Sequence, residues 1–203
     1  MAVTPNYSWP VPVNTDLVKD GAEAIKDLGD AIDATVFGLP SGGITLINAT
    51  TITAGTTVNI DSVFSVTYRN YLILVDVTKD SSDITFNLQL RAGGVTNTST
   101  IYQRQELLAQ STTVAGARVV SQTSWGLALG VRATQTAIIN MFSPQLNVRT
   151  KANFQFGATD LAFSTLGTNS GFLYHSTNYQ ADGVALLFGQ PATGTARIYG
   201  YKD

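Results

Sequence analysis

The sequence predicts a mainly β protein: a single antiparallel β-sandwich, jelly-roll-like, preceded by an extended arm and one amphipathic helix. Two observations carry this prediction. From residue 44 onward, apolar and polar residues alternate with a period of two, and turn-forming residues divide the alternation into short segments. Before that point, only one stretch has the spacing of a helix. We therefore expect an arm over 1–14, a helix over 15–38 and a sandwich over 41–203.

Three prolines in residues 1–14 exclude a helix there and favour extended backbone. The arm also carries large apolar side chains, which need a surface to cover them. They could fold back onto the sandwich, or the arm could dock on another subunit or another protein. We favour docking, because an arm without a core of its own needs a host surface. The predicted anchoring residues are Tyr7, Trp9 and Pro10.

The helix is bounded by recognisable end signals. Thr15 and its two neighbours can all act as N-caps, and Asp20 places a negative charge in the first turn. Gly38 can adopt the left-handed conformation that closes a helix, and Pro40 blocks its continuation. These signals predict one helix ending at residue 38.

The helix carries an apolar seam with 3-4-3-4 spacing, while its charged residues share the opposite face. Small residues flank the seam, so that neighbouring backbones can approach closely. The helix could pack on its own sandwich, or copies of it could bundle around a symmetry axis. We favour a bundle of three copies, because a lone helix before a complete sandwich has little else to pack against. The predicted oligomerisation residues are Val18, Gly21, Ile25, Leu28 and Ile32.

Eight to ten short strands are expected after residue 43. Residues 70–78 and 83–91 alternate strongly, and the polar segment between them predicts a hairpin. Residues 102–111 look briefly helical, although their β context favours a strand. No repeat at solenoid or propeller spacing is evident, which argues against a β-helical body.

Composition and motifs give little support to a catalytic, metal-binding or nucleic-acid-binding role. The net charge is −2 and no Lys/Arg cluster occurs, so we expect neither nucleic acid nor a membrane as a partner. The chain has no cysteine and one histidine, His175, which argues against a zinc site and against a catalytic triad. Its only glutamates are Glu23 and Glu106. We therefore expect a non-enzymatic protein without a cofactor.

Two segments carry a family resemblance. Residues 9–33, WPVPVNTDLVKDGAEAIKDLGDAID, resemble the opening of tailed-bacteriophage virion proteins of the fibre, minor tail, head-fibre and decoration types. Residues 194–203, GTARIYGYKD, look like the last strand of jelly-roll modules in the same proteins. The positions that match in the first segment are Trp9, Thr15, Asp16, Val18, Gly21, Ala22, Ile25, Leu28, Ala31, Ile32 and Asp33.

This resemblance implies a homotrimer located in the virion, anchored to capsid, portal or tail proteins by its N-terminal segment, with a β-rich head. The short chain favours a short fibre or a decoration protein over a long receptor-reaching fibre. An alternative is the receptor- or glycan-binding head of a tail fibre, which would contact a host surface glycan through exposed aromatic side chains. A small esterase or glycosidase is disfavoured by the missing motifs. The candidate receptor contacts are Trp125, Tyr174 and Tyr179.

Overall fold

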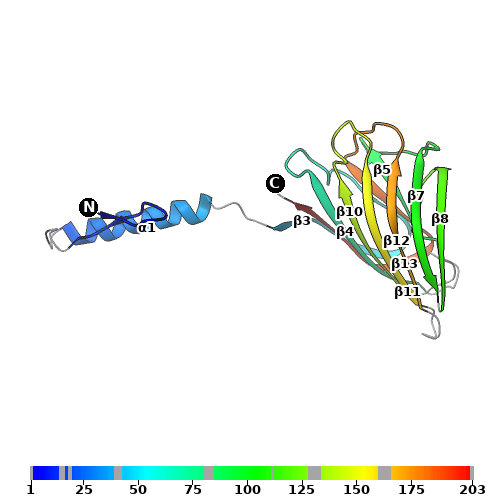
Figure 1. Ribbon diagram of the computed structural model, residues 1–203, viewed down its shortest axis with the longest axis horizontal. Helices are drawn as coiled ribbons and strands as arrows, with labels where there is room; N and C mark the ends of the chain where they lie inside the picture. Colours follow the sequence, from blue (N-terminus) through cyan, green and yellow to red (C-terminus); the bar gives the residue numbers. More distant parts are fainter. Residues whose placement is uncertain are drawn as a thin grey trace. The chain divides into compact units, whose positions relative to one another are not determined.

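The computed structural model divides into two compact units, Met1–Gly42 and Gly43–Asp203, which are described separately below (Figure 1). The described residues are 2–13, 17, 20–38, 43–79, 85–110, 112–127, 134–159 and 166–201. In these ranges the chain is mainly β with a single helix. The predicted fold class, an antiparallel β-sandwich preceded by one amphipathic helix, is confirmed.

The first unit contains helix α1, Gly21–Gly38, and a two-stranded hairpin of β1, Ala2–Val3, and β2, Pro10–Val11. The expected N-caps at 14–16 lie outside the described residues. The arm was predicted to be extended throughout, and the hairpin corrects that prediction. Backbone bonds from Thr4 N to Trp9 O, 2.9 Å, and from Ser8 N to Thr4 O, 3.0 Å, close the turn. The prolines still exclude a helix, but two-residue strands are too short to leave a periodic signal.

The second unit is built from strands, and Figure 1 labels the longer ones. Their bounds are β3 Ile44–Ile60, β4 Asn70–Lys79, β5 Asn87–Ala92, β6 Val95–Thr96, β7 Tyr102–Gln110, β8 Thr113–Gln122, β9 Trp125–Gly126, β10 Thr134–Phe142, β11 Lys151–Thr159, β12 Leu166–His175 and β13 Gly183–Tyr201. The segment with a helical look, residues 102–111, contributes strand β7, because pairing on both sides overrides its weak helical propensity.

The strands form one curled antiparallel sheet in the order β6-β5-β13-β4-β10-β11-β12-β7-β8, with β3 also paired to β13 and β9 to β5. Strand β13 joins the two layers: residues 183–187 pair with β5, and residues 192–201 pair with β4. Gly189, with φ +70°, lies at the transition between these partners. The predicted hairpin of residues 70–78 and 83–91 is therefore wrong, since β13 lies between β4 and β5.

The core lies between the layers of the sandwich and is filled by alternate residues of the paired strands. On β10 and β11, every second side chain is buried and its neighbours are exposed or half-buried. Phe86 and Phe188 stack in the core with ring centroids 5.3 Å apart. This alternation leaves the other face of the β10-β11-β12-β7-β8 layer to carry polar and aromatic side chains outward.

Candidate functional site

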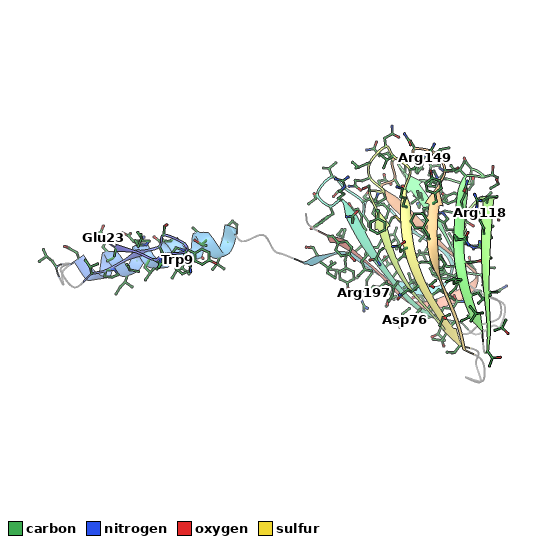
Figure 2. All side chains as sticks on the ribbon, in the orientation of Figure 1. Trp9, Glu23, Asp76, Arg118, Arg149 and Arg197 are labelled. Carbon is green, nitrogen blue, oxygen red and sulfur yellow. The ribbon has the colours of Figure 1, made fainter. Side chains whose placement is uncertain are left out.

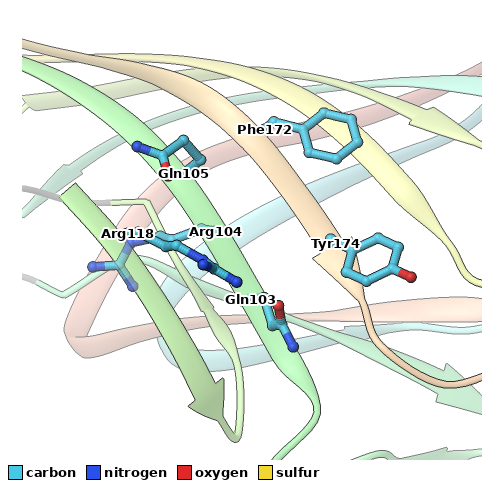
Figure 3. Close-up of a pocket in the computed structure, with 6 residues that line it drawn as sticks. All are labelled: Gln103, Arg104, Gln105, Arg118, Phe172 and Tyr174. Atoms are coloured by element: carbon cyan, nitrogen blue, oxygen red, sulfur yellow. The ribbon is translucent and has the colours of Figure 1, made fainter. Parts of the chain in front are cut away.

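A hollow of about 370 Å³ lies on the outward face of strands β12, β7 and β8 (Figure 3). Figure 3 shows Phe172 and Tyr174 side by side on β12, with Gln103 and Gln105 on the neighbouring strand. Its volume falls in the range of small-molecule binding sites. The lining residues are Gln103, Arg104, Gln105, Arg118, Phe172 and Tyr174.

Strand register brings these distant residues together. Phe172 on β12 is opposite Gln105 on β7, which is opposite Arg118 on β8. The next row places Tyr174 opposite Gln103. Residues two apart on a strand point to the same face, so both rows face outward together. The hollow is thus a direct product of the sheet's pairing.

A second hollow, of about 460 Å³, shares Tyr174 with the first. Arg149 contacts the residue that the two hollows share: its Nη1 donates a hydrogen bond of 2.8 Å to the Tyr174 hydroxyl. Lys151 on β11 is opposite Tyr174 in the sheet. The two hollows together are called the Tyr174 surface below. The second is lined by Phe142, Ser143, Val148, Arg149, Lys151, Tyr174 and Asn178.

The Tyr174 surface is positively charged. Arg104 is neutralised, because its Nε lies 3.0 Å from the buried carboxylate of Glu106. Arg118, Arg149 and Lys151 are exposed, and within the described chain none of them forms an ion pair. Among the described residues that line the two hollows there is no aspartate or glutamate. On a chain of net charge −2, this concentration of unpaired cations favours an anionic partner.

Beneath the surface, the ionisable groups are packed and bonded. Glu106 also accepts a hydrogen bond of 2.6 Å from Asn169 Nδ2, and His175 has 0% of its surface exposed. His175 Nδ1 lies 2.8 Å from the carbonyl oxygen of Thr177, which fits a neutral ring donating from Nδ1. Burial lowers the pKa of His175 and so favours that neutral form. These geometries place both groups in the framework under the surface, where they hold strands together.

The three predicted receptor contacts have different positions. Tyr174 lies at the centre of the surface described above. Trp125 is 1% exposed and packs edge-on against Tyr102, so the prediction of an exposed contact is wrong for this residue, which lies in the core. Tyr179 is half-buried, with its ring 5.4 Å from that of His175. The sequence around Trp125 does not show which face of the sheet its side chain takes. Its strand, β9, has only two residues, too few for an alternating pattern.

Sequence reasoning missed the residues that accompany Tyr174. Phe172, Arg118 and Arg149 come from two strands and a loop, and nothing in their local sequence indicates that they meet. One signal was available: Phe172 and Tyr174 alternate with the apolar Leu173, so a strand that buries leucine must turn both aromatic rings outward.

The second candidate region is helix α1. Of the predicted seam, Val18 lies outside the described residues, while Gly21, Leu28 and Ile32 are half-buried. Ile25 is 66% exposed, and Val36, about three turns further along the same side of the helix, is 59% exposed. Ala24 is buried on the adjacent flank. In the described part of the unit, the hairpin thus covers one edge of the apolar face, and the other edge stays exposed.

The predicted anchoring residues contact their own helix. Trp9 Nε1 donates a hydrogen bond of 2.8 Å to Thr35 Oγ1, and Thr35 in turn donates to the Ala31 carbonyl at 2.8 Å. The Tyr7 ring stacks on the Trp9 ring with centroids 5.1 Å apart, and Tyr7 remains 59% exposed. Pro10 is half-buried in β2. Trp9 is therefore engaged within the unit, and Tyr7 presents the more accessible ring.

Comparison with known proteins assigns the chain to no family. No protein-family model matches it, and a search of curated proteins finds no significant match. In the part of the chain that the structure describes, no helix is both long and apolar enough to cross a membrane.

Proposed function

We propose that this chain is a non-enzymatic structural protein of a phage virion, a homotrimeric short fibre or decoration protein. In this proposal, α1 holds three copies together, and the unit Met1–Gly42 attaches them to capsid, portal or tail proteins. The β-sandwich then forms the head. The resemblance of residues 9–33 to phage virion proteins supplies the class of particle, and the geometry of α1 supplies the mode of assembly.

The observation that carries the proposal is the uncovered edge of α1. Ile25 and Val36 are well exposed on a helix whose only described cover is a hairpin of two-residue strands. Each side chain of this size contributes roughly 1.5–3 kcal/mol when it is fully buried. Gly29 and Ala22 flank the same edge and permit close backbone approach. Copies of the helix would supply the missing cover.

The size of the unit leads to the same conclusion. Isolated helices of about this length are marginal in water, and units near 40 residues usually need disulfides, metals or oligomerisation to fold stably. The chain has no cysteine for a disulfide. The described residues hold no cluster of three or more side chains that could bind a metal. Association through α1 would supply the stability that the unit needs.

The test is to locate the protein on particles. Phage particles purified from the source of the sequence would be probed with a gold-labelled antibody raised against the sandwich and viewed by electron microscopy. Labelling at regular sites on the capsid or tail supports the proposal. Particles that carry no label, while the protein is found free in the same lysate, would overturn it.

A second function is favoured by a separate observation, the exposed aromatic and cationic residues of the Tyr174 surface. A receptor- or glycan-binding head would need such a surface on the sandwich.

A further inference from the structure

We infer that the Tyr174 surface is a binding site for an acidic saccharide, a sugar chain that carries carboxylate groups. This inference rests on the sandwich alone and goes beyond the assembly role proposed for α1, since assembly requires no ligand. It follows from three kinds of side chain that converge there: exposed aromatic rings, unpaired cations and side-chain amides.

The aromatic rings provide a stacking platform. Phe172 is 41% exposed and Tyr174 is half-buried, and both project from β12 on the same face (Figure 3). One face of a sugar ring carries C–H groups, which pack against the electron-rich face of an aromatic ring. A phenylalanine exposed beside a hollow, where a polar residue would be better solvated, is what such packing needs.

The cations favour a ligand that carries negative charge. The guanidinium groups of Arg118 and Arg149 border the two hollows, and a guanidinium binds a carboxylate through two parallel hydrogen bonds. Lys151 adds a third unpaired charge. Figure 2 shows that Arg197, another exposed arginine of the sandwich, lies well apart from Arg118 and Arg149. Arg118, Arg149 and Lys151 are therefore three exposed cations at one surface, and Arg197 offers an exposed arginine outside it.

The amides provide partners for hydroxyl groups. Gln103 and Gln105 line the first hollow and Asn178 the second, and each amide can both donate and accept. Sugar hydroxyls also do both, so amides suit them better than a purely cationic surface would.

The framework under the surface holds these groups in place. Trp125 Nε1 donates a hydrogen bond of 3.2 Å to the backbone carbonyl of Tyr174, and Arg149 fixes the Tyr174 hydroxyl from outside. Gly171 allows β12 to approach β7, because a Cβ there would lie 2.1 Å from the Gln105 carbonyl oxygen. Groups that are ordered before binding lose less entropy when the ligand arrives.

An acidic saccharide fits better than a nucleic acid. Binding along a phosphate backbone requires a long cationic track, whereas three unpaired cations on a chain of net charge −2 make a short one. A saccharide with a carboxylate on some of its rings matches a few cations interspersed with aromatic and amide groups.

The experiment is a calorimetric titration of the full-length protein with four probes: oligogalacturonate, oligosialic acid, the carboxyl-reduced form of the oligogalacturonate, and a short oligothymidylate. The variants are Arg118→Ala and Phe172→Ser, with Arg197→Ala as the matched control that removes an exposed arginine elsewhere on the sandwich. Thermal melting confirms that every variant is folded. Light scattering on the same samples reports the oligomeric state, so that failure of assembly and failure of binding are read separately.

Binding of at least one acidic probe, with no measurable binding of the reduced form, is the expected result. Arg118→Ala should then weaken binding about tenfold or more, since a charge-assisted hydrogen bond is lost. Phe172→Ser should weaken it as well, and Arg197→Ala should leave it unchanged. The inference is overturned if neither acidic probe binds, if the reduced saccharide binds equally well, if the oligothymidylate binds more tightly, or if Arg197→Ala weakens binding as much as Arg118→Ala.

Discussion

Trp9 and Thr35 are joined by a hydrogen bond of 2.8 Å from the indole Nε1 to the threonine hydroxyl, across 26 positions of the chain. This bond ties the N-terminal hairpin to the last turn but one of α1. It turns a segment that its prolines predict to be extended into part of a small folded unit. Among the described residues, the other apolar edge of α1 stays exposed, and this is the edge that the proposed assembly would use.

Trp9→Phe should loosen the hairpin. The substitution removes the indole donor and keeps an aromatic ring, which costs about 1 kcal/mol for one hydrogen bond. The measurement is amide hydrogen exchange of Thr4 and Ser8, whose N–H groups close the hairpin. Exchange about fivefold faster is expected. Tyr7→Phe is the control, since the hydroxyl it removes is not needed for the ring stack; equal effects of both variants would contradict the role of the bond.

Ile25→Asp should abolish assembly without unfolding the sandwich. Ile25 is 66% exposed in the single chain, so a charge there costs little until copies associate, when it would be buried without a partner. Sedimentation velocity should show loss of the oligomer. Ala34→Asp places the same charge on an exposed position of the charged face and should assemble normally. An Ile25→Asp protein that assembles like the parent would show that the seam is misplaced.

Gly171→Ala should destabilise the sandwich strongly. The new Cβ would lie 2.1 Å from the Gln105 carbonyl oxygen, so the backbones of β12 and β7 must move apart. Overpacking of this kind costs about 1–3 kcal/mol in the free energy of unfolding, measured by urea denaturation. Gly116→Ala is the matched control, because its Cβ would meet the Leu107 side chain at 3.7 Å and the Glu106 carbonyl oxygen at 3.9 Å, both ordinary contact distances. Similar losses in the two variants would contradict the close approach of β12 and β7.

His175 should make the protein less stable in mild acid. Burial lowers its pKa in the folded state, so the unfolded chain binds the proton more readily. The stability contributed by the neutral ring is complete above the ordinary pKa of 6.5 and is lost as the pH falls through the lowered pKa of the folded state. His175 is the chain's only histidine, so urea unfolding between pH 7 and 5 reports it directly. His175→Gln should be less stable at pH 7, and its free energy of unfolding should change less between pH 7 and 5. If that free energy falls with pH as much as in the parent, the pH dependence comes from other groups.

The fold class was predictable because it depends on local periodicity. Alternation on segments such as residues 151–159 marks both the strand and its buried face, and the structure buries Ala152 and Phe154 as alternation requires. Strand partners were not predictable in this way. The segment 70–78 predicts a hairpin with 83–91, yet β13, more than 90 residues further on, pairs between them. Alternation fixes which face is buried but carries no information on which strand lies alongside.

The candidate site was predictable only in part, for the same reason. Tyr174 was identified from its residue type, whereas Arg118 joins it through the pairing of β12 with β7 and β7 with β8. Trp125 has the residue type of a receptor contact, but the two-residue strand β9 turns it into the core. The exposure of a single aromatic residue depends on tertiary packing, which no local pattern records.

The most direct test of the account is light scattering after size exclusion, on the full chain and on a chain that starts at Gly43. We expect a trimer for the full chain and a folded monomer for the shorter one, because in the proposed assembly α1 makes the contact between copies. A full chain that remains monomeric at micromolar concentration, or a shorter chain that is still trimeric, would contradict the assignment of assembly to α1.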